Sequence, residues 1–140
     1  MSQLKERLSN IYKHNLAAVE VYKGVIKHVS DEKIRNTLGG FLNDHERHLS
    51  ELREYFDKNK GEKPSDWRDL KGVLLDVYTS LLSLTGEKGA LKALHTAENI
   101  VLRQYKEEEK EHHDDDMAKI IKKQLKDEEK HRDYLESIGA

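Results

Sequence analysis

The chain repeats itself, without a gap, at a shift of 83 residues. The segment FLNDHERHLSEL (41–52) returns as QLKDEEKHRDYL (124–135), and five of the twelve aligned positions are identical. The same shift places Asn15 on Glu98 and Tyr22 on Tyr105. A chain with this pattern is built from two copies of one structural unit, so the shape of that unit decides the fold.

Each copy has the pattern of a helical hairpin. Two long segments in each half carry inward residues at alternating spacings of three and four, which is the period of an amphipathic α-helix. Ser30–Asp31 and Asp114–Asp116 supply N-terminal caps for the second helix of each half. The turn within each half is very short, so the two helices must be antiparallel. The predicted fold is all-α, with hairpins at 3–59 and 87–138.

Residues 60–86 are predicted to cross from one hairpin to the other. A helix of about 27 residues is roughly 40 Å long, and a connection that returns along it needs a segment of this length. An apolar stripe in this segment predicts a short extra helix, with Leu70, Val73, Leu74, Val77, Leu81 and Leu84 on one face. Packing against the bundle is the expected use of this stripe. A homodimer interface is the alternative.

The composition excludes several classes of protein. A length of 140 residues suits one domain, 1–140, with a core of its own. A net charge of −2 argues against a nucleic-acid partner. The chain has no cysteine, which removes thiolate catalysis and Cys-based metal sites. It shows no apolar run of membrane-spanning length and no signal sequence, so we expect no membrane partner and a cytoplasmic location.

Six polar residues interrupt the inward stripes: Asn15, His45, His48, Glu98, Glu128 and His131. If the turns lie near residues 30 and 113, Asn15 and His45 lie 15 positions on either side of the first turn. Glu98 and Glu128 lie 15 positions on either side of the second turn. His48 and His131 follow one helical turn later on the same face. All six should therefore meet at one level, about 22 Å from the turns at 1.5 Å per residue.

This set predicts a metal site. Imidazole and carboxylate groups bind iron, zinc and manganese. Glu98 and Glu128 carry a charge of −2, which balances one divalent ion, whereas a neutral imidazole has one lone pair and does not bridge two ions as a carboxylate does. The pattern therefore favours one metal ion or an asymmetric pair. The alternative is a metal-free polar layer in which Glu pairs with protonated His, because uncompensated buried charges cost several kcal/mol.

The set resembles the dimetal site of the ferritin-like superfamily, which uses one Glu from each of two helices and Glu-x-x-His from each of the others. Glu98 and Glu128-x-x-His131 match this template, whereas Asn15 and His45-x-x-His48 depart from it. The chain is most similar to small bacterial ferritin-like domains related to rubrerythrins. The resemblance implies a ferritin-like four-helix bundle with a long crossover. For members with the full ligand set it implies two irons, bridged by carboxylates, that react with oxygen or peroxide.

Further residues are expected to support the site. Asp44 and Asp127 recur in the repeat about 90° off the core direction, so they are either partners of a ligating His or ion-paired at the helix boundaries. His95 lies one turn from Glu98 and is an extra ligand or, as we favour, a residue of a helix interface. For Tyr22 and Tyr105 we favour core packing with a hydroxyl hydrogen bond over a redox role. The run EEEKEHHDDD (107–116) reads better as a solvated helix end than as a metal site.

Two functions follow as hypotheses. The first is a ferritin-like metalloprotein for iron and oxygen or peroxide handling, an oxidoreductase if it is an enzyme. It would bind iron, or alternatively zinc or manganese, through His45, His48, Glu98, Glu128 and His131, while Asn15 orients a ligand or water. The second is a non-catalytic bundle, such as a scaffold or a stress-related protein, with a metal-free polar layer. A hydroxylase is a third reading, but it needs a channel of which the sequence shows no sign.

Overall fold

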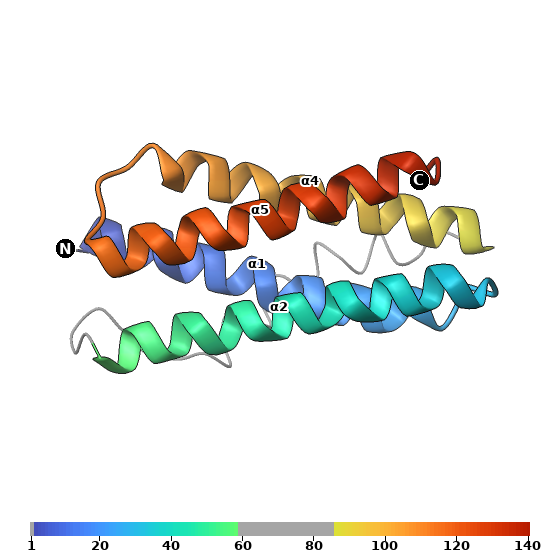
Figure 1. The fold of residues 1–140 in the computed structure, drawn as a ribbon, viewed down its shortest axis with the longest axis horizontal. Helices are drawn as coiled ribbons and strands as arrows, with labels where there is room; N and C mark the ends of the chain where they lie inside the picture. Colours follow the sequence, from blue (N-terminus) through green and yellow to red (C-terminus); the bar gives the residue numbers. More distant parts are fainter. Residues whose placement is uncertain (1, 59–85) are drawn as a thin grey trace.

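The computed structural model describes residues 2–58 and 86–140. These residues form four helices: α1 (Ser2–Ile26), α2 (Glu32–Lys58), α4 (Gly86–Glu109) and α5 (Asp115–Ser137) (Figure 1). The predictions for 60–86, the short extra helix and the homodimer through it included, lie outside the described residues. Gly86 is the exception, and it begins α4.

The four helices form an antiparallel bundle. Each packs against two neighbours, so that α1 contacts α2 and α4 while α5 contacts α4 and α2. All four neighbouring pairs run antiparallel, and α2 ends at the opposite end of the bundle from the start of α4 (Figure 1). Of the four pairs, α2 and α5 approach each other least closely. The predicted all-α four-helix bundle is confirmed.

Side chains predicted as caps begin α2 and α5. The Asp31 carboxylate accepts a hydrogen bond from the backbone N–H of Ile34 at 2.9 Å, and that of Asp114 accepts one from Met117 at 2.8 Å. Each bond satisfies one of the N–H groups that a helix start leaves without an intrahelical partner. The turn between α1 and α2 is also tied to the other hairpin, because the backbone N–H of Ser30 donates to Glu87 at 3.0 Å. Both predicted caps are confirmed.

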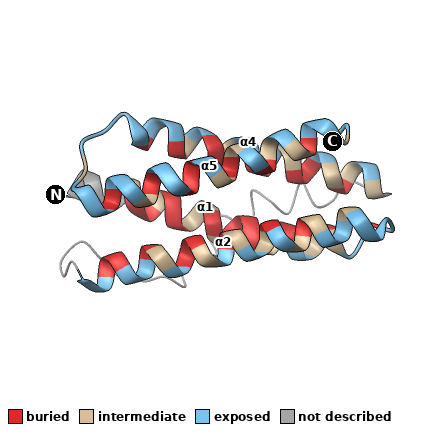
Figure 2. Cartoon of the chain, in the orientation of Figure 1, coloured by how far each residue is buried: buried red, intermediate tan, exposed pale blue. Residues whose placement is uncertain are grey.

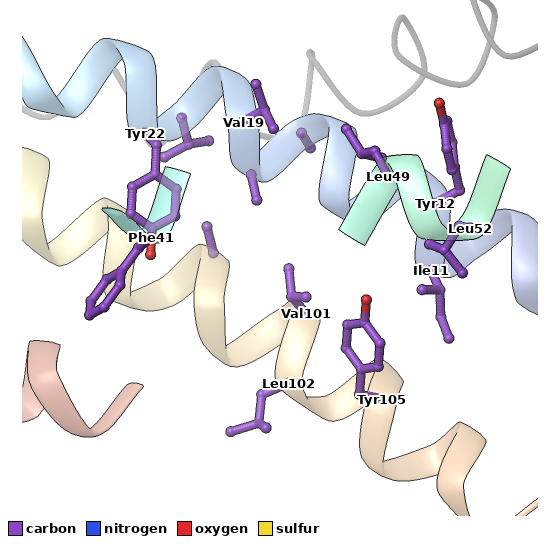
Figure 3. Packing of buried hydrophobic residues seen from close by; sticks show 14 of the residues in the cluster. Ile11, Tyr12, Val19, Tyr22, Phe41, Leu49, Leu52, Val101, Leu102 and Tyr105 are labelled. Atoms are coloured by element: carbon purple, nitrogen blue, oxygen red, sulfur yellow. The ribbon is translucent and has the colours of Figure 1, made fainter. Parts of the chain in front are cut away.

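The buried faces of the helices meet along the bundle axis (Figure 2). Leu8 and Ile11 of α1, Leu52 of α2 and Val101 of α4 are all inaccessible to solvent. Figure 3 shows Tyr22 and Tyr105 turned from α1 and α4 into the interior among such side chains. Burial of each large apolar side chain contributes roughly 1.5–3 kcal/mol. This core fixes the positions of the polar groups embedded in it.

Gly39 and Gly40 lie inside α2, where glycine costs about 1 kcal/mol relative to alanine. A Cβ atom added at either position would meet no atom of the described residues within 4 Å. A close approach of another described helix therefore does not explain these two glycines. Among the helices described, none carries an apolar stretch sufficient to span a lipid bilayer.

Candidate metal centre

The structure brings together all six inward polar residues that the sequence places at one level. We call this set the polar layer: Asn15 from α1, His45 and His48 from α2, Glu98 from α4, and Glu128 and His131 from α5. Each is completely inaccessible to solvent. The sequence predicts that these six residues lie at equal depth in the two hairpins. The contacts between their side chains agree with this prediction.

Four members of the polar layer, His45, Glu98, Glu128 and His131, form a group that could hold a metal ion. Each offers one ligand atom, and these atoms all lie within 4.8 Å of one another. The two oxygens of Glu98 are shared: Oε1 lies 3.0 Å from Nε2 of His45, and Oε2 lies 2.6 Å from Nδ1 of His131. The hydroxyl of Tyr22 also donates to Oε2 of Glu98, at 2.7 Å. We call these four the four-residue group.

His48 lies on the other side of His45, next to Asn15. The amide oxygen of Asn15 is 2.8 Å from Nδ1 of His45 and 3.2 Å from Nδ1 of His48. His45 therefore turns Nε2 towards Glu98 and Nδ1 towards Asn15. The amide nitrogen of Asn15 donates to the hydroxyl of Tyr105 at 2.8 Å and to the carbonyl of Ile11 at 2.9 Å. Asn15 is thus fully engaged, and it can fix the tautomer of His45.

Glu128 is the exception in this network. Neither of its carboxylate oxygens has a hydrogen-bond partner among the described residues. Oε1 is 3.4 Å from Nδ1 of both His45 and His48, and Oε2 is 3.6 Å from Nδ1 of His131. A buried carboxylate without hydrogen bonds costs several kcal/mol unless a cation compensates its charge. Its oxygens face the centre of the layer, so a metal ion there would supply that compensation.

Asp44 and Asp127 hold the outer nitrogens of two imidazoles, each across the boundary between hairpins. Nε2–H of His131 donates to Asp44 at 2.8 Å, and Nε2–H of His48 donates to Asp127 at 2.9 Å. Both carboxylates also accept from the guanidinium of Arg47, at 3.1 and 2.9 Å. The two readings that the sequence left open, a His partner and an ion pair, therefore apply together.

The charges around the layer shift several pKa values. Burial alone would raise the pKa of Glu98, but the charges and hydrogen bonds of His45 and His131 hold it well below its usual range. Burial alone would lower the pKa of His131, but its hydrogen bonds to Asp44 and Glu98, together with the nearby carboxylate of Glu128, raise it to about 11. Without a metal ion, His131 is therefore an imidazolium that donates from both nitrogens. It is paired with carboxylates on both sides.

The same balance applies to the outer pairs. Burial opposes protonation of His48, yet its hydrogen bond to Asp127 and the nearby negative charge of Glu128 raise its pKa. The pKa values of Asp44 and Asp127 are lowered against the effect of burial, chiefly by the hydrogen bonds from His131 and His48 respectively and from Arg47. Burial and the negative charge of Glu98 raise the pKa of Tyr22, which keeps this phenol protonated and donating to Glu98.

Two sequence expectations concern residues away from this centre. Nδ1 of His95 lies 2.7 Å from the carbonyl oxygen of Ala140, and its Nε2 lies 3.7 Å from Glu136, so His95 contacts the end of the chain instead of the four-residue group. Most of the run 107–116 is exposed, as expected for a solvated helix end. Glu108 is its buried exception, and it pairs with Arg7 at 2.8 Å and with His113 at 3.0 Å.

Sequence reasoning assigned no role to three residues of this network: Phe41 and Gln124, which contact the layer, and Arg47, which contacts Asp44 and Asp127. Gln124 accepts a hydrogen bond from the hydroxyl of Tyr105 at 2.5 Å. Phe41 occupies the position equivalent to Gln124 in the repeat, and its ring stacks on that of His131 with the ring centres 4.2 Å apart. For Arg47 the available signal was its position, three residues after Asp44 and one before His48.

Residues 3–111, more than half of the chain, match the family described as Domain of unknown function (DUF2383). The chain belongs to this family. The match with DUF2383 covers Asn15, His45, His48 and Glu98, and it ends before α5, which carries Glu128 and His131. No curated protein and no solved structure matches the chain.

Proposed function

We propose that this DUF2383 protein is a ferritin-like metal-binding protein whose four-residue group, His45, Glu98, Glu128 and His131, holds one divalent ion. Iron is the proposed metal, with zinc or manganese as alternatives. The proposed role is the handling of iron together with oxygen or peroxide, as an oxidoreductase of ferritin-like type. The support comes from the geometry of the layer and from the match of Glu98 and Glu128-x-x-His131 to the helix-bundle metal template.

The unpartnered carboxylate of Glu128 is the observation that carries this proposal. Its two oxygens are buried without a donor among the described residues, while three imidazole nitrogens lie within 3.6 Å. A hydrogen-bonded polar layer would be expected to satisfy this group, because most buried polar atoms in native proteins have a partner. A metal ion satisfies it together with the lone pairs of His45 and His131.

The charges favour one ion over two. Glu98 and Glu128 supply a charge of −2, which balances a single divalent ion. On the opposite side of His45 the place equivalent to Glu98 is taken by the neutral amide of Asn15. His48 is also expected to be a ligand, and it lies on the Asn15 side. We propose that it belongs to the side of an asymmetric centre with the lower affinity for a cation. The mixed nitrogen and oxygen donors suit iron, zinc and manganese.

The residues of the chain prepare the site for such an ion. Tyr22 holds one oxygen of Glu98, and Asn15 accepts from Nδ1 of His45, which leaves the lone pair of Nε2 on the Glu98 side. The buried core excludes water from the layer and so strengthens each electrostatic interaction within it. Bound iron would supply redox chemistry towards oxygen or peroxide.

The metal-free polar layer is the second candidate, and one observation favours it. His131 already pairs with Glu98 at 2.6 Å and with Asp44 at 2.8 Å, which is what a protonated imidazole needs when no metal is present. In this case the protein acts through its outer faces as a scaffold or stress-related bundle. Replacement of Glu128 and His131 by apolar residues would then leave function intact and stability equal or higher.

Metal loading of the purified protein separates the two candidates. The metal-free protein is incubated with Fe²⁺ under nitrogen, or with Zn²⁺ or Mn²⁺, desalted, and analysed for metal per chain. We expect about one ion per chain in the wild type, because two carboxylates balance one divalent ion. Glu128→Gln keeps the shape but removes the charge, and it should lose most of this metal.

Glu46→Gln is the matched control, since Glu46 is exposed on α2 beside His45 and the change in charge is the same. It should retain the wild-type content. Fewer than roughly 0.2 ions per chain in the wild type would reject the metal site, given that structural sites bind with ~10 kcal/mol or more. Equal losses in both variants would show that the bound metal is not held by the four-residue group. Hydrogen peroxide consumption by the iron-loaded protein then tests the proposed reaction class.

A further inference from the structure

Arg47 lies at the seam between α2 and α5, the pair of neighbouring helices that approach least closely. Its guanidinium donates to Asp44 of its own helix at 3.1 Å and to Asp127 of α5 at 2.9 Å. It is therefore a single cation shared by two carboxylates, one from each copy of the repeat. The planar fork of arginine suits this task, because it offers several N–H donors in fixed directions.

Each of these carboxylates holds one imidazole of the polar layer. Asp44 accepts from Nε2–H of His131 at 2.8 Å, and Asp127 accepts from Nε2–H of His48 at 2.9 Å. The two imidazoles are buried, whereas Arg47 and the two aspartates are partly exposed. Arg47 is thus the outermost member of two chains of contacts, and each chain ends at a ring whose Nδ1 faces the centre of the layer.

We propose that Arg47 is a positioning residue for the metal centre: by holding Asp44 and Asp127 in place, it fixes the rings of His131 and His48 with Nε2 outward and Nδ1 inward. This inference rests on the proposed metal site, and it names a residue that touches no ligand of that site directly. Partners that hold the far nitrogen of a ligating imidazole commonly change metal affinity by 10–100-fold. Arg47 acts on two such partners at once.

The counterpart of Arg47 in the repeat shows that this role belongs to one half only. Lys130 occupies the equivalent position on α5, and its ammonium lies 5.7 Å from the ring centre of Phe41. Phe41 in turn stacks on His131. The bundle therefore has one bridging guanidinium, instead of two symmetric ion pairs, at these equivalent positions. Lys130 supplies a matched control with the same loss of charge on the other helix.

The test compares Arg47→Gln, Arg47→Lys and Lys130→Gln with the wild type in two measurements. Zinc affinity is measured by competition with a chelator of known affinity. The hydrogen-bonded Nε2–H protons of His48 and His131 are followed by nitrogen-edited NMR of the full chain, with and without zinc. The NMR reading is local to the rings, so a loss of overall stability alone does not change it.

We expect Arg47→Gln to weaken zinc binding at least about tenfold and to broaden both Nε2–H signals by faster exchange with water. Arg47→Lys should fall between this variant and the wild type, because a lysine cannot bridge both carboxylates with a planar fork. Lys130→Gln should resemble the wild type. Unchanged zinc affinity and unchanged signals in Arg47→Gln would overturn the inference, as would equal effects in Lys130→Gln.

The two proposals fail in different ways. If the wild type binds none of zinc, iron and manganese, the metal site is rejected, and Arg47 then has no metal centre to position. The NMR arm still reports whether Arg47 holds the two rings in the metal-free protein. If the wild type binds zinc but Arg47→Gln binds it equally well, the metal site stands and the inference about Arg47 is wrong.

Discussion

At the scale of single residues, His131 shows how the same contacts serve a metal-free and a metal-bound protein. Both of its nitrogens face carboxylate oxygens, at 2.6 and 2.8 Å, so the ring is protonated on both sides when no ion is present. The hydrogen bond to Asp44 would survive metal binding, because it uses the outer nitrogen. The contact of Nδ1 with Glu98 would be lost, because that nitrogen would give up its proton to bind a metal ion.

This exchange predicts how metal affinity depends on pH. The pKa of His131 is raised to about 11, so a proton occupies Nδ1 throughout the neutral range and competes with the metal ion. A pKa above the working pH means that affinity rises as pH rises, by about tenfold per pH unit for each proton displaced. Zinc affinity measured by chelator competition should therefore be at least about a hundredfold higher at pH 8 than at pH 6.

Asp44→Asn serves as the comparison for this prediction. It removes the strongest of the hydrogen bonds that raise the pKa of His131, so the dependence on pH should become shallower at the upper end of the range. Affinity that is equal at pH 6 and pH 8 in the wild type would show that no protonated imidazole is displaced, and it would contradict the assignment of His131 as a ligand.

At the scale of the elements, local signals in the sequence determine where the helices begin and which faces they bury. Asp31 and Asp114 each cap the helix that follows. The inward stripes give the buried faces, and the short turns give antiparallel neighbours. At Gly39 and Gly40 the local signal opposes the element, since helix interiors disfavour glycine. No described neighbour comes close enough to require them.

Two glycine substitutions should therefore act in opposite directions. Gly40 is exposed inside α2 with room for a Cβ atom, so Gly40→Ala should raise the free energy of unfolding by about 1 kcal/mol. Gly86, at the start of α4, has a φ of +79°, where alanine is strained, so Gly86→Ala should lower it. Urea unfolding of the metal-free protein measures both changes. A destabilising Gly40→Ala would show that the glycine has a structural role in the bundle.

The sequence predicts the helices better than it predicts the partners of each polar side chain. Spacing alone puts Asn15 and Glu98 at equivalent depths, but it does not say which nitrogen of His45 faces which of them. That depends on side-chain rotations, which helical periodicity does not encode. Arg47 was missed for the same reason, since its bond to Asp127 joins residues 80 positions apart and depends on how closely α2 and α5 approach.

At the scale of the whole molecule, the duplication produces a centre that is nearly symmetric in position and asymmetric in chemistry. Equivalent positions carry Asn15 and Glu98, His45 and Glu128, and Arg47 and Lys130. The outer pairs remain symmetric, because each hairpin supplies an aspartate to the histidine of the other. One side of the centre thus carries the carboxylate of Glu98, and the other carries the amide of Asn15.

This asymmetry has a consequence for the number of metal ions. Two similar hairpins place two similar sets of side chains around one axis, but only the Glu98 side has a carboxylate in addition to Glu128. Affinity for a cation should therefore differ between the two sides, and we expect one strongly held ion near Glu98. The repeat determines where such a centre can form. The residues at positions 15 and 45, which are Asn and His instead of the Glu found at the equivalent positions 98 and 128, determine how many ions it can hold.

Anomalous diffraction from crystals of the zinc- or iron-loaded protein locates the ion and so shows whether the four-residue group binds it. We expect one strong peak inside the bundle, about 2.0–2.2 Å from an oxygen of Glu98, an oxygen of Glu128, and a nitrogen of each of His45 and His131. No peak among these four side chains in crystals that contain the metal, or a peak only at the exposed acidic run near the α4–α5 turn, would contradict it.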